Sequence, residues 1–322
     1  MRKAALLFNP LSGGRSTRRI AELKSVLALL RGAKIEADLF LPDSTADAAE
    51  KVRQAINNGC DTVFACGGDG TIHNVIQVLA NTAVALAVLP MGTANALARD
   101  LGLPMKVLAA ARAALNGQTR RVALGRIQFS DLAGNPGSRF FVVAAGAGAD
   151  AHLFYKLYTG HKQRIGMAAY YAKAWHLWFS YPMTRFAVEY AGSGSGETRT
   201  AEVTELMAVR IRNFGGVLRE FAPGASLDRN DVRLILCATA SRAAYLEYVA
   251  RGLFGAARKV RGIELAYSEK VSCKYLAVGP HAGAPAPKIY VEADGELVGT
   301  LPAEINMVPD ALTVVAPRGM QE

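Results

Sequence analysis

Short apolar runs alternate with amphipathic segments over the first third of the chain. The runs at 3–8, 61–66 and 83–90 are apolar and the run at 34–41 alternates, and all four predict strands. Residues between them recur at helical spacing, and Ser-Thr-Ala-Asp at 44–47 has the pattern of a capping box at a helix start. Strands separated by single helices are typical of a parallel sheet that is covered on both faces. We therefore expect a three-layer α/β domain at the N-terminus.

The pattern changes after about Arg120. From there the chain consists of short, often alternating runs separated by glycine, proline, asparagine or serine. Such runs are typical of an antiparallel β-sandwich. Two helical segments interrupt them, around 162–180 and 241–258. The predicted fold is α/β plus β, with an N-terminal domain over 1–122 and a β-sandwich domain over 123–304.

The net charge suggests the kind of partner. The chain of 322 residues has a formal net charge of +10. A basic protein of this size is attracted to phosphorylated ligands or anionic lipid surfaces, although the charge is also compatible with solubility alone. No dense run of lysine and arginine is present, so we do not expect a nucleic-acid partner.

The cysteines and the apolar segments exclude several other classes. The four cysteines form no CxxC pair, so the sequence predicts neither a zinc site nor a redox dithiol. The apolar start stops at Asn9-Pro10, which is too early for a secretory signal. No window of about eighteen uninterrupted apolar residues could span a bilayer. A cytoplasmic protein is the expectation.

Three loops that contain glycine follow three of the predicted strands. They are Asn-Pro-Leu-Ser-Gly-Gly at 9–14, Gly-Gly-Asp-Gly-Thr at 67–71 and Leu-Pro-Met-Gly-Thr-Ala-Asn at 89–95. The carboxyl ends of parallel strands meet at one sheet edge, where ligands bind, and glycines there let the backbone approach phosphate. No Walker-type loop is present. We predict a nucleotide site that includes Asn9, Pro10, Ser12, Gly13, Gly67, Gly68, Asp69, Gly70, Thr71, Gly92, Thr93 and Asn95.

Asp69 lies at the centre of the second loop. A carboxylate beside a polyphosphate repels it unless a divalent cation lies between them. We therefore interpret Asp69 as a residue linked to Mg²⁺ in a nucleotide site. An ordinary helix cap is the alternative interpretation.

Together these stretches resemble a known family. The three loops, the continuation of the third as Ala-Leu-Ala-Arg-Asp-Leu-Gly-Leu-Pro, and Val-Glu-Ala-Asp-Gly-Glu at 291–296 are similar to the diacylglycerol kinase and sphingosine kinase family of ATP-dependent lipid kinases. The similarity covers nearly the whole chain, although Gly-Gly-Asp-Gly-Thr alone is shared with NAD kinases and phosphofructokinases. The resemblance implies ATP and Mg²⁺ as cofactors, a lipid substrate, and a cleft between a nucleotide-binding domain and a lipid-binding sandwich. It also implies that the last strand, within 305–318, returns to complete the first domain.

Asp294 and Glu296 lie in the last of these stretches. By itself, Asp-Gly between alternating strands is most simply a hairpin turn. The resemblance implies a different role, in which Asp294 is the base toward the lipid hydroxyl. We assign Glu296 a supporting role.

Several positions depart from the pattern of the family. Where many bacterial diacylglycerol kinases carry Asp, this chain has Ala96 and Ala123. The Asp-Asp-Gly loop that often holds a structural metal appears as Asp-Arg-Asn-Asp at 228–231. We therefore assign no structural metal there, and Asp69 is the acidic residue that we carry over in the nucleotide loop.

The expected function is transfer of the γ-phosphate of ATP to a hydroxyl of diacylglycerol, ceramide or a sphingoid base. His73 and Asn-Ala-Leu-Ala at 95–98 resemble sphingosine kinases more, which tilts the acceptor slightly toward a sphingoid base or ceramide. His73 is equally well a helix-face residue without a ligand. The alternatives are a soluble kinase of the NAD kinase type and, because of Ala96, Ala123 and the altered loop at 228–231, a non-catalytic sensor of lipid or nucleotide.

Two segments interleave aromatic and basic residues, at 154–179 and 245–262. Such segments suit the headgroup region of an anionic membrane, and packing on the sandwich is the alternative. We expect a cytoplasmic enzyme that binds the inner membrane surface reversibly. The sequence predicts no oligomeric state.

Overall fold

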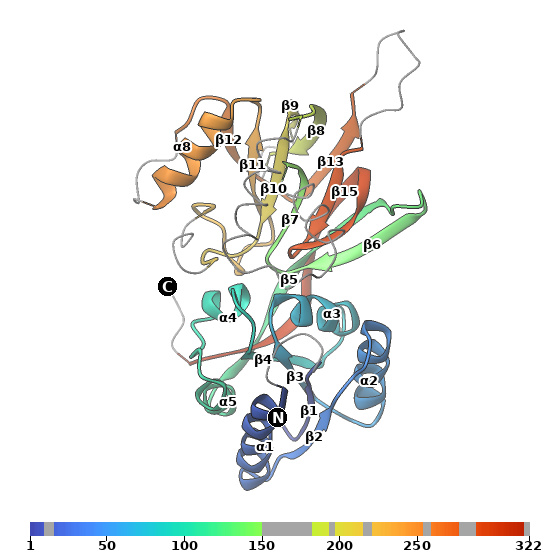
Figure 1. Cartoon of the computed structure of the whole chain (residues 1–322), viewed down its shortest axis with the longest axis vertical. Helices are drawn as coiled ribbons and strands as arrows, with labels where there is room; N and C mark the ends of the chain where they lie inside the picture. Colours follow the sequence, from blue (N-terminus) through green and yellow to red (C-terminus); the bar gives the residue numbers. More distant parts are fainter. Residues whose placement is uncertain are drawn as a thin grey trace. The chain divides into compact units, whose positions relative to one another are not determined.

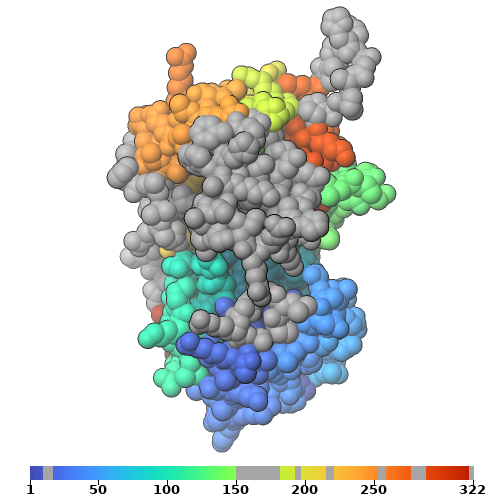
Figure 2. Space-filling model, viewed as in Figure 1, coloured from blue at the N-terminus to red at the C-terminus, as the bar shows by residue number. Residues whose placement is uncertain are grey.

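The chain divides into two units in the computed structural model. Unit 1 comprises Met1–Leu124, Ile211–Arg219 and Val308–Glu322, and unit 2 comprises Gly125–Arg210 and Glu220–Met307. Strands β5 (Gln118–Ser130) and β15 (Glu296–Ala316) each run from one unit into the other. The structure describes residues 1–9, 16–149, 182–192, 197–214, 221–253, 259–276 and 288–318, which are coloured in Figure 2.

A parallel sheet forms the centre of unit 1. Its strands are, in spatial order, β2 (Glu36–Phe40), β1 (Lys3–Leu7), β3 (Thr62–Gly67), β4 (Ala85–Pro90) and the last part of β15. Every residue of β3 and β4 is buried, as expected for strands that are covered on both faces.

Helices cover both faces of this sheet (Figure 1). On one face α1 (Ser16–Gly32) packs against α5 (Val107–Leu115), and on the other α2 (Thr45–Asn57) packs against α3 (Asp69–Leu79). The short helix α4 (Ala96–Asp100) follows β4. The hydroxyl of Ser44 accepts the N–H of Asp47 at 3.1 Å, which confirms the capping signal predicted for the start of α2. The N-terminal three-layer α/β architecture is confirmed.

The end of β15 is bound into unit 1. Thr313 and Val314 pair in parallel with Ala85 and Leu86 of β4. Arg121 of β5 adds to this join, because its guanidinium donates to the carbonyl of Thr82 at 2.7 Å and to the hydroxyl of Thr313 at 3.0 Å. The sequence predicts that the first domain ends at 122 and resumes at 305. In the structure, unit 1 ends at Leu124 and its last segment begins at Val308.

Residues 211–214 join unit 1, which the sequence did not suggest. One hydrogen-bonding side chain explains the join. Oδ1 of Asp100 accepts the N–H groups of Arg212 at 2.8 Å and Asn213 at 2.9 Å.

Antiparallel strands form unit 2. Six of them are hydrogen-bonded side by side in the order β12-β11-β10-β7-β14-β15. β15 also pairs with β13, which pairs with β8, and β8 pairs with β9. β5 pairs with β6. Alternate residues of β8 lie in the buried core, as do residues of the facing strands. The β-sandwich is confirmed. Its remaining elements are β6 (Pro136–Phe141), β7 (Ala144–Gly148), β8 (Phe186–Ala191), β9 (Thr198–Val203), β10 (Glu205–Val209), β11 (Val232–Cys237), α8 (Arg242–Leu253), β12 (Ile263–Ser268), β13 (Lys270–Tyr275) and β14 (Tyr290–Ala293).

Among the helices that lie within the described ranges, none has the length and apolar character needed to cross a membrane.

Candidate nucleotide and acceptor sites

The second glycine loop connects β3 to α3. β3 ends at Gly67 and α3 begins at Asp69, so the N-cap is Gly68, which makes no side-chain cap. The side chain of Thr71 lies directly over Gly67, because a Cβ added at Gly67 would be 2.1 Å from Thr71 Oγ1. The start of α3 thus brings main-chain N–H groups to the carboxyl end of β3, where phosphate groups commonly bind.

The loop after β4 packs against the second glycine loop. A Cβ added at Gly92 would lie 2.4 Å from the Cα of Gly68 and 2.9 Å from Oδ1 of Asn95. Asn95, which has a φ of 52°, closes this loop with its side-chain amide. Its Oδ1 accepts the N–H of Gly92 at 2.8 Å, and its Nδ2 donates to the carbonyl of Gly92 at 2.9 Å. The contact between the two loops therefore leaves no room for a Cβ at Gly92, and a Cβ at Gly68 would lie 3.0 Å from the Cα of Gly92.

Asp69 binds across the same contact. Its Oδ2 accepts the N–H of Asn95 at 3.0 Å and its Oδ1 accepts the N–H of Ala96 at 2.8 Å. Asp69 is in the first turn of α3, yet the helix that it caps is α4. Asp69 therefore does cap a helix, but the helix is α4 and not α3, which contains Asp69.

The same carboxylate is chemically suited to Mg²⁺. Two carboxylate oxygens offer about four acceptor positions, so two N–H bonds are compatible with a cation on Asp69. Mg²⁺ is usually held by one or two carboxylates together with phosphates of the substrate. In the described part of the chain, no group of three His, Cys, Asp or Glu residues could form a metal site without such a substrate.

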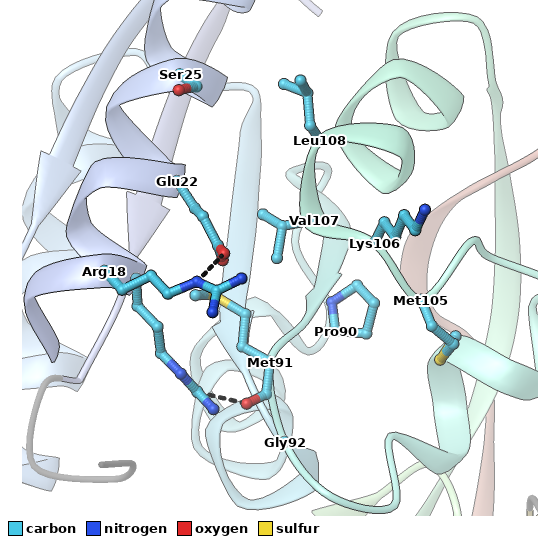
Figure 3. A pocket seen from close by; sticks show the side chains of 11 residues that line it. Arg18, Glu22, Ser25, Pro90, Met91, Gly92, Met105, Lys106, Val107 and Leu108 are labelled. Carbon is cyan, nitrogen blue, oxygen red and sulfur yellow. Dashed lines mark hydrogen bonds and ion pairs between the residues drawn. The ribbon is translucent and has the colours of Figure 1, made fainter. Parts of the chain in front are cut away.

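A basic cavity of about 650 Å³ adjoins the loop after β4 (Figure 3). It lies between the first half of α1 and the start of α5, and Gly92 is one of its lining residues. Arg18, Arg19 and Lys106 line it together with one acid, Glu22, which pairs with Arg18. Arg19 donates to the carbonyl of Met91 and so braces the loop beside Gly92. The excess of positive charge suits an anionic ligand.

The structure describes some, but not all, of the other residues predicted for the nucleotide site. Thr93 is exposed, and Gly70 and Thr71 are half-buried in the first turn of α3. Asn9 follows β1, which runs parallel to β3, as β3 does to β4. The carboxyl ends of these three strands, with the predicted residues that follow them, therefore lie at the same edge of the sheet. Pro10, Ser12 and Gly13 lie outside the described residues.

Asp294 is at the tip of the hairpin that connects β14 to β15 in unit 2. The turn consists of Asp294, with a φ of 50°, and Gly295, with a φ of 81°, which is the combination found in type I′ turns. The hairpin that the sequence suggested is therefore present. The carboxylate of Asp294 is also bound, because its Oδ1 accepts the N–H groups of residues 142–144 at 2.8 to 3.2 Å. The main-chain N–H of Asp294 in turn donates to the carbonyl of Ala144 at 2.8 Å.

A second acid, Glu292, supports this turn from inside the sandwich. Its side chain is buried, and its Oε2 accepts the N–H of Gly295 at 2.7 Å. The register of β14 against β15 shifts between Val291 and Glu292, and such bulges redirect side chains at the rims of sheets. Glu296 is exposed at the start of β15. Sequence reasoning selected Glu296 and missed Glu292, although an acid within a buried strand was a visible signal.

Comparison with known proteins decides the family. Residues 3–127 match the diacylglycerol kinase catalytic domain, and residues 142–316 match the YegS C-terminal NAD kinase beta sandwich-like domain. A diacylglycerol kinase of Mycobacterium tuberculosis (strain CDC 1551 / Oshkosh) is 30% identical over 317 residues, which cover 98% of this chain and 96% of the relative. The diacylglycerol kinase of Bacillus subtilis (strain 168) is 27% identical over 325 residues, covering 100% and 99%. This chain belongs to the diacylglycerol kinase family.

Solved structures agree with this fold. A crystal structure of a diacylglycerol kinase from Bacillus anthracis str. Sterne has a TM-score of 0.71 at 19% identity and covers 99% of this chain and 98% of its own. Yeast NADH kinase in complex with NADH has a TM-score of 0.54 at 10% identity, covering 99% and 84%. The likeness to NADH kinase is therefore a distant one of fold. As a member of the diacylglycerol kinase family, the chain is a lipid kinase, which uses ATP and transfers phosphate to an alcohol.

Two of the departures of this lipid kinase from the pattern of its family, Ala96 and Ala123, are at buried positions, whereas Arg229 and Asn230 are exposed. Ala96 is buried at the start of α4, where its N–H binds Asp69, and Ala123 is buried in β5. His73 is buried on α3, which agrees with the interpretation as a packed helix residue.

The tyrosines at the start of the predicted membrane segment 245–262 face the sandwich. The hydroxyl of Tyr248 donates to the carbonyl of Phe221 at 2.8 Å, and the hydroxyl of Tyr245 lies 2.6 Å from that of Thr204. Burial raises the pKa of Tyr245 above its ordinary value. Packing, the alternative given above, thus explains these two side chains. The segment 154–179 lies outside the described residues.

Asp100 is a further residue beside the nucleotide site. It lies in the continuation of the third glycine loop, but sequence reasoning did not select it as a site residue. The residue is half-buried, and burial raises the pKa of its carboxyl group, while the N–H groups of Asn213 and Arg212 act in the opposite direction. Because it follows the loop of Gly92 and Asn95 on α4, Asp100 ties that part of the nucleotide site to the segment at 211–214.

Proposed function

We propose that this lipid kinase transfers the γ-phosphate of ATP to the hydroxyl of diacylglycerol, with Asp294 as the base. Two relatives that are similar over nearly their whole length are named diacylglycerol kinase, which favours this acceptor over ceramide and sphingoid bases. We assign nucleotide binding to unit 1 and the proton-accepting group to unit 2.

On the nucleotide side, the two packed loops supply the proposed phosphate site. The N–H groups at the start of α3 and the hydroxyl of Thr93 are suitable donors, and the basic cavity beside Gly92 adds positive charge. Asp69 would hold Mg²⁺ together with the phosphates of ATP. When bound, Mg²⁺ neutralises charge that develops on the phosphates during transfer.

On the acceptor side, the proposed chemistry needs one proton acceptor at a fixed position. As the lipid oxygen forms a bond to the γ-phosphorus, the bond from that phosphorus to the bridging oxygen of ADP breaks. The proton of the lipid hydroxyl moves to the carboxylate of Asp294. General base catalysis of this kind contributes about 10²- to 10⁴-fold in rate.

The observation that carries the proposal is how firmly the hairpin holds Asp294. Three successive N–H groups bind its Oδ1, and Glu292 fixes the N–H of Gly295 next to it. An ordinary two-residue turn needs neither set of contacts. Oriented groups of this type are typical of sites at which geometry limits the rate.

The test uses purified protein with Mg-ATP and labelled γ-phosphate in mixed micelles. We expect diacylglycerol to be phosphorylated faster than ceramide, sphingosine or monoacylglycerol, and NAD not at all. Asp294→Asn keeps an oxygen for the three N–H groups but loses the proton acceptor, so kcat should fall by at least about 100-fold while ATP affinity, measured by calorimetry, is unchanged. Glu296→Gln, at the exposed neighbouring position, is the matched control and should lose less. Near-normal turnover of Asp294→Asn would refute the assignment of the base, and phosphorylation of NAD but of no lipid would refute the acceptor.

The membrane surface stays a prediction for this enzyme, as does a cytoplasmic location. The net charge of +10 is compatible with anionic lipid, and the described part of α8 offers Leu246 as an exposed apolar residue. Cosedimentation with vesicles of anionic or neutral lipid measures the association directly.

A further inference from the structure

The largest fully buried side chain among the described residues is a cation, Arg210. Arg210 follows β10 in unit 2, and its main-chain N–H donates to the carbonyl of Val143 at 2.9 Å. The residue as a whole has a relative exposure of 0%. A buried charge is costly unless oriented polar groups compensate it, so the surroundings of Arg210 have to supply them.

Carbonyl oxygens of one loop supply that compensation. Nη1 of Arg210 donates to the carbonyls of Arg229 and Asp231, both at 2.7 Å, and Nη2 donates to the carbonyl of Leu227 at 3.2 Å. These three residues alternate along the chain, so the loop turns every second carbonyl toward one point. Carbonyl oxygens that converge in this way repel each other unless a positive charge lies between them, as in loops that bind Ca²⁺ or Mg²⁺.

The acidic side chain of the same loop is engaged by a second arginine. Both carboxylate oxygens of Asp231 accept from the guanidinium of Arg229, from Nε and Nη2, at 2.6 Å each. The Arg229 guanidinium also lies 4.0 Å from the ring centre of Tyr267, whose hydroxyl donates to the carbonyl of Gly224 at 3.1 Å. A metal ion at this loop would have to displace Arg229 from Asp231 and approach carbonyls that already face Arg210.

We propose that the loop 227–231 is a cation site whose cation is built into the protein as the guanidinium of Arg210. The guanidinium gives these carbonyls the positive charge that a metal ion would supply, so the loop can carry Arg229 and Asn230 at the positions where the family resemblance implies a second acid and a glycine. Because the proposal concerns the stability of unit 2, it is independent of the function proposed above.

The experiment compares Arg210→Lys with Arg210→Met by thermal unfolding of the full chain without nucleotide. Lysine keeps a positive charge near the carbonyls, whereas methionine fills similar space and leaves them without a cation. We expect Arg210→Met to have a Tm lower than Arg210→Lys by at least about 5 °C. Equal stability of the two variants, or a more stable methionine variant, would show that packing is what matters and would overturn the proposal.

Added cations provide a second readout. In Arg210→Ala, a few millimolar methylguanidinium should raise Tm, whereas it should have no such effect on Arg121→Ala, which removes an exposed arginine that also donates to main-chain carbonyls. The Tm of the unaltered protein should be the same in EDTA and in Mg²⁺ or Ca²⁺. A Tm that falls in EDTA, or an Arg210→Ala variant that responds to methylguanidinium no more than Arg121→Ala does, contradicts a built-in cation. If Arg210→Ala does not fold, the lysine and methionine pair and the EDTA comparison still decide.

Discussion

The contact between the two glycine loops predicts that Gly92→Ala destabilises the enzyme and weakens nucleotide binding. Carbon atoms touch at about 3.5 to 4.0 Å. The added Cβ would lie 2.4 Å from the Cα of Gly68 and 3.2 Å from its nitrogen. Both are main-chain atoms, so no side-chain rotation relieves the overlap. The loops must separate instead.

The expected magnitude follows from the size of this overlap. Overpacking in a well-packed site costs about 1 to 3 kcal/mol. The entropy of unfolding is about 2.1 cal/mol/K per residue, so for 322 residues one kcal/mol shifts Tm by about 1.5 °C, and Tm should fall by about 1.5 to 4.5 °C. The strain also reaches Asn95, whose Oδ1 would be 2.9 Å from the new methyl group and whose N–H binds Asp69. Because both loops belong to the proposed phosphate site, their separation should raise the Kd for ATP.

The assay is thermal unfolding and calorimetric titration with ATP for Gly92→Ala beside Gly32→Ala. Gly32 closes α1, and a Cβ there meets nothing within 4 Å. Such a replacement is neutral or stabilises by about 0.4 to 1 kcal/mol. If Gly92→Ala matches Gly32→Ala in Tm and in ATP affinity, the close approach of Gly68 and Gly92 is not a feature of the protein in solution.

Two further predictions concern buried acids. Burial raises the pKa of Asp100, so the folded protein binds this proton more tightly than the unfolded chain does. The contribution of Asp100 to stability is therefore full below the ordinary pKa of about 3.9 and is lost as pH rises through the raised value. Asp100→Asn keeps an oxygen for the N–H groups of Arg212 and Asn213 but cannot ionise. Its free energy of unfolding, measured by urea titration, should therefore increase relative to that of the wild type as pH rises through this range. A difference between the two proteins that stays constant with pH would contradict the raised pKa of Asp100. Glu292→Gln keeps an acceptor for Gly295 and should preserve kcat, whereas Glu292→Ala should lower kcat more than it changes KM. Equal rates for both Glu292 variants would remove Glu292 as a positioning residue.

The fold was predictable because each of its patterns is local. Alternation of apolar runs and helical segments indicated the parallel sheet, and the switch to short alternating runs indicated the sandwich. The start of α2 was predictable from Ser44 and Asp47 because a capping box involves residues only three apart. The return of β15 to β4 has no local cause, and only the family resemblance suggested it. The inclusion of 211–214 in unit 1 was missed because it depends on Asp100, more than a hundred residues away.

Site residues were predictable by type but not by contact. The glycines were selected because they let the backbone approach phosphate, but the structure shows that Gly92 also has to be small because it touches the main chain of Gly68. Arg210 was missed because an arginine after an apolar strand looks like a solvated strand end, and its burial depends on a loop that lies seventeen or more residues further on. Glu292 was missed because a bulge in the hairpin sets its direction.

The replaced acids of this chain lead to a consequence for its metal. At 96, where the family resemblance implies an Asp, the structure has an alanine whose N–H binds Asp69. At the loop 227–231, arginine side chains bind both the carbonyls and the carboxylate of Asp231. Among the predicted nucleotide residues, Asp69 is the acid that remains for Mg²⁺. A cation held by one carboxylate needs phosphate oxygens for the rest of its shell, so we expect Mg²⁺ to bind together with ATP and only weakly before it. Calorimetry with Mg²⁺ alone and then with ATP present separates the two cases. Tight binding of Mg²⁺ in the absence of nucleotide would mean that acids other than Asp69 hold it.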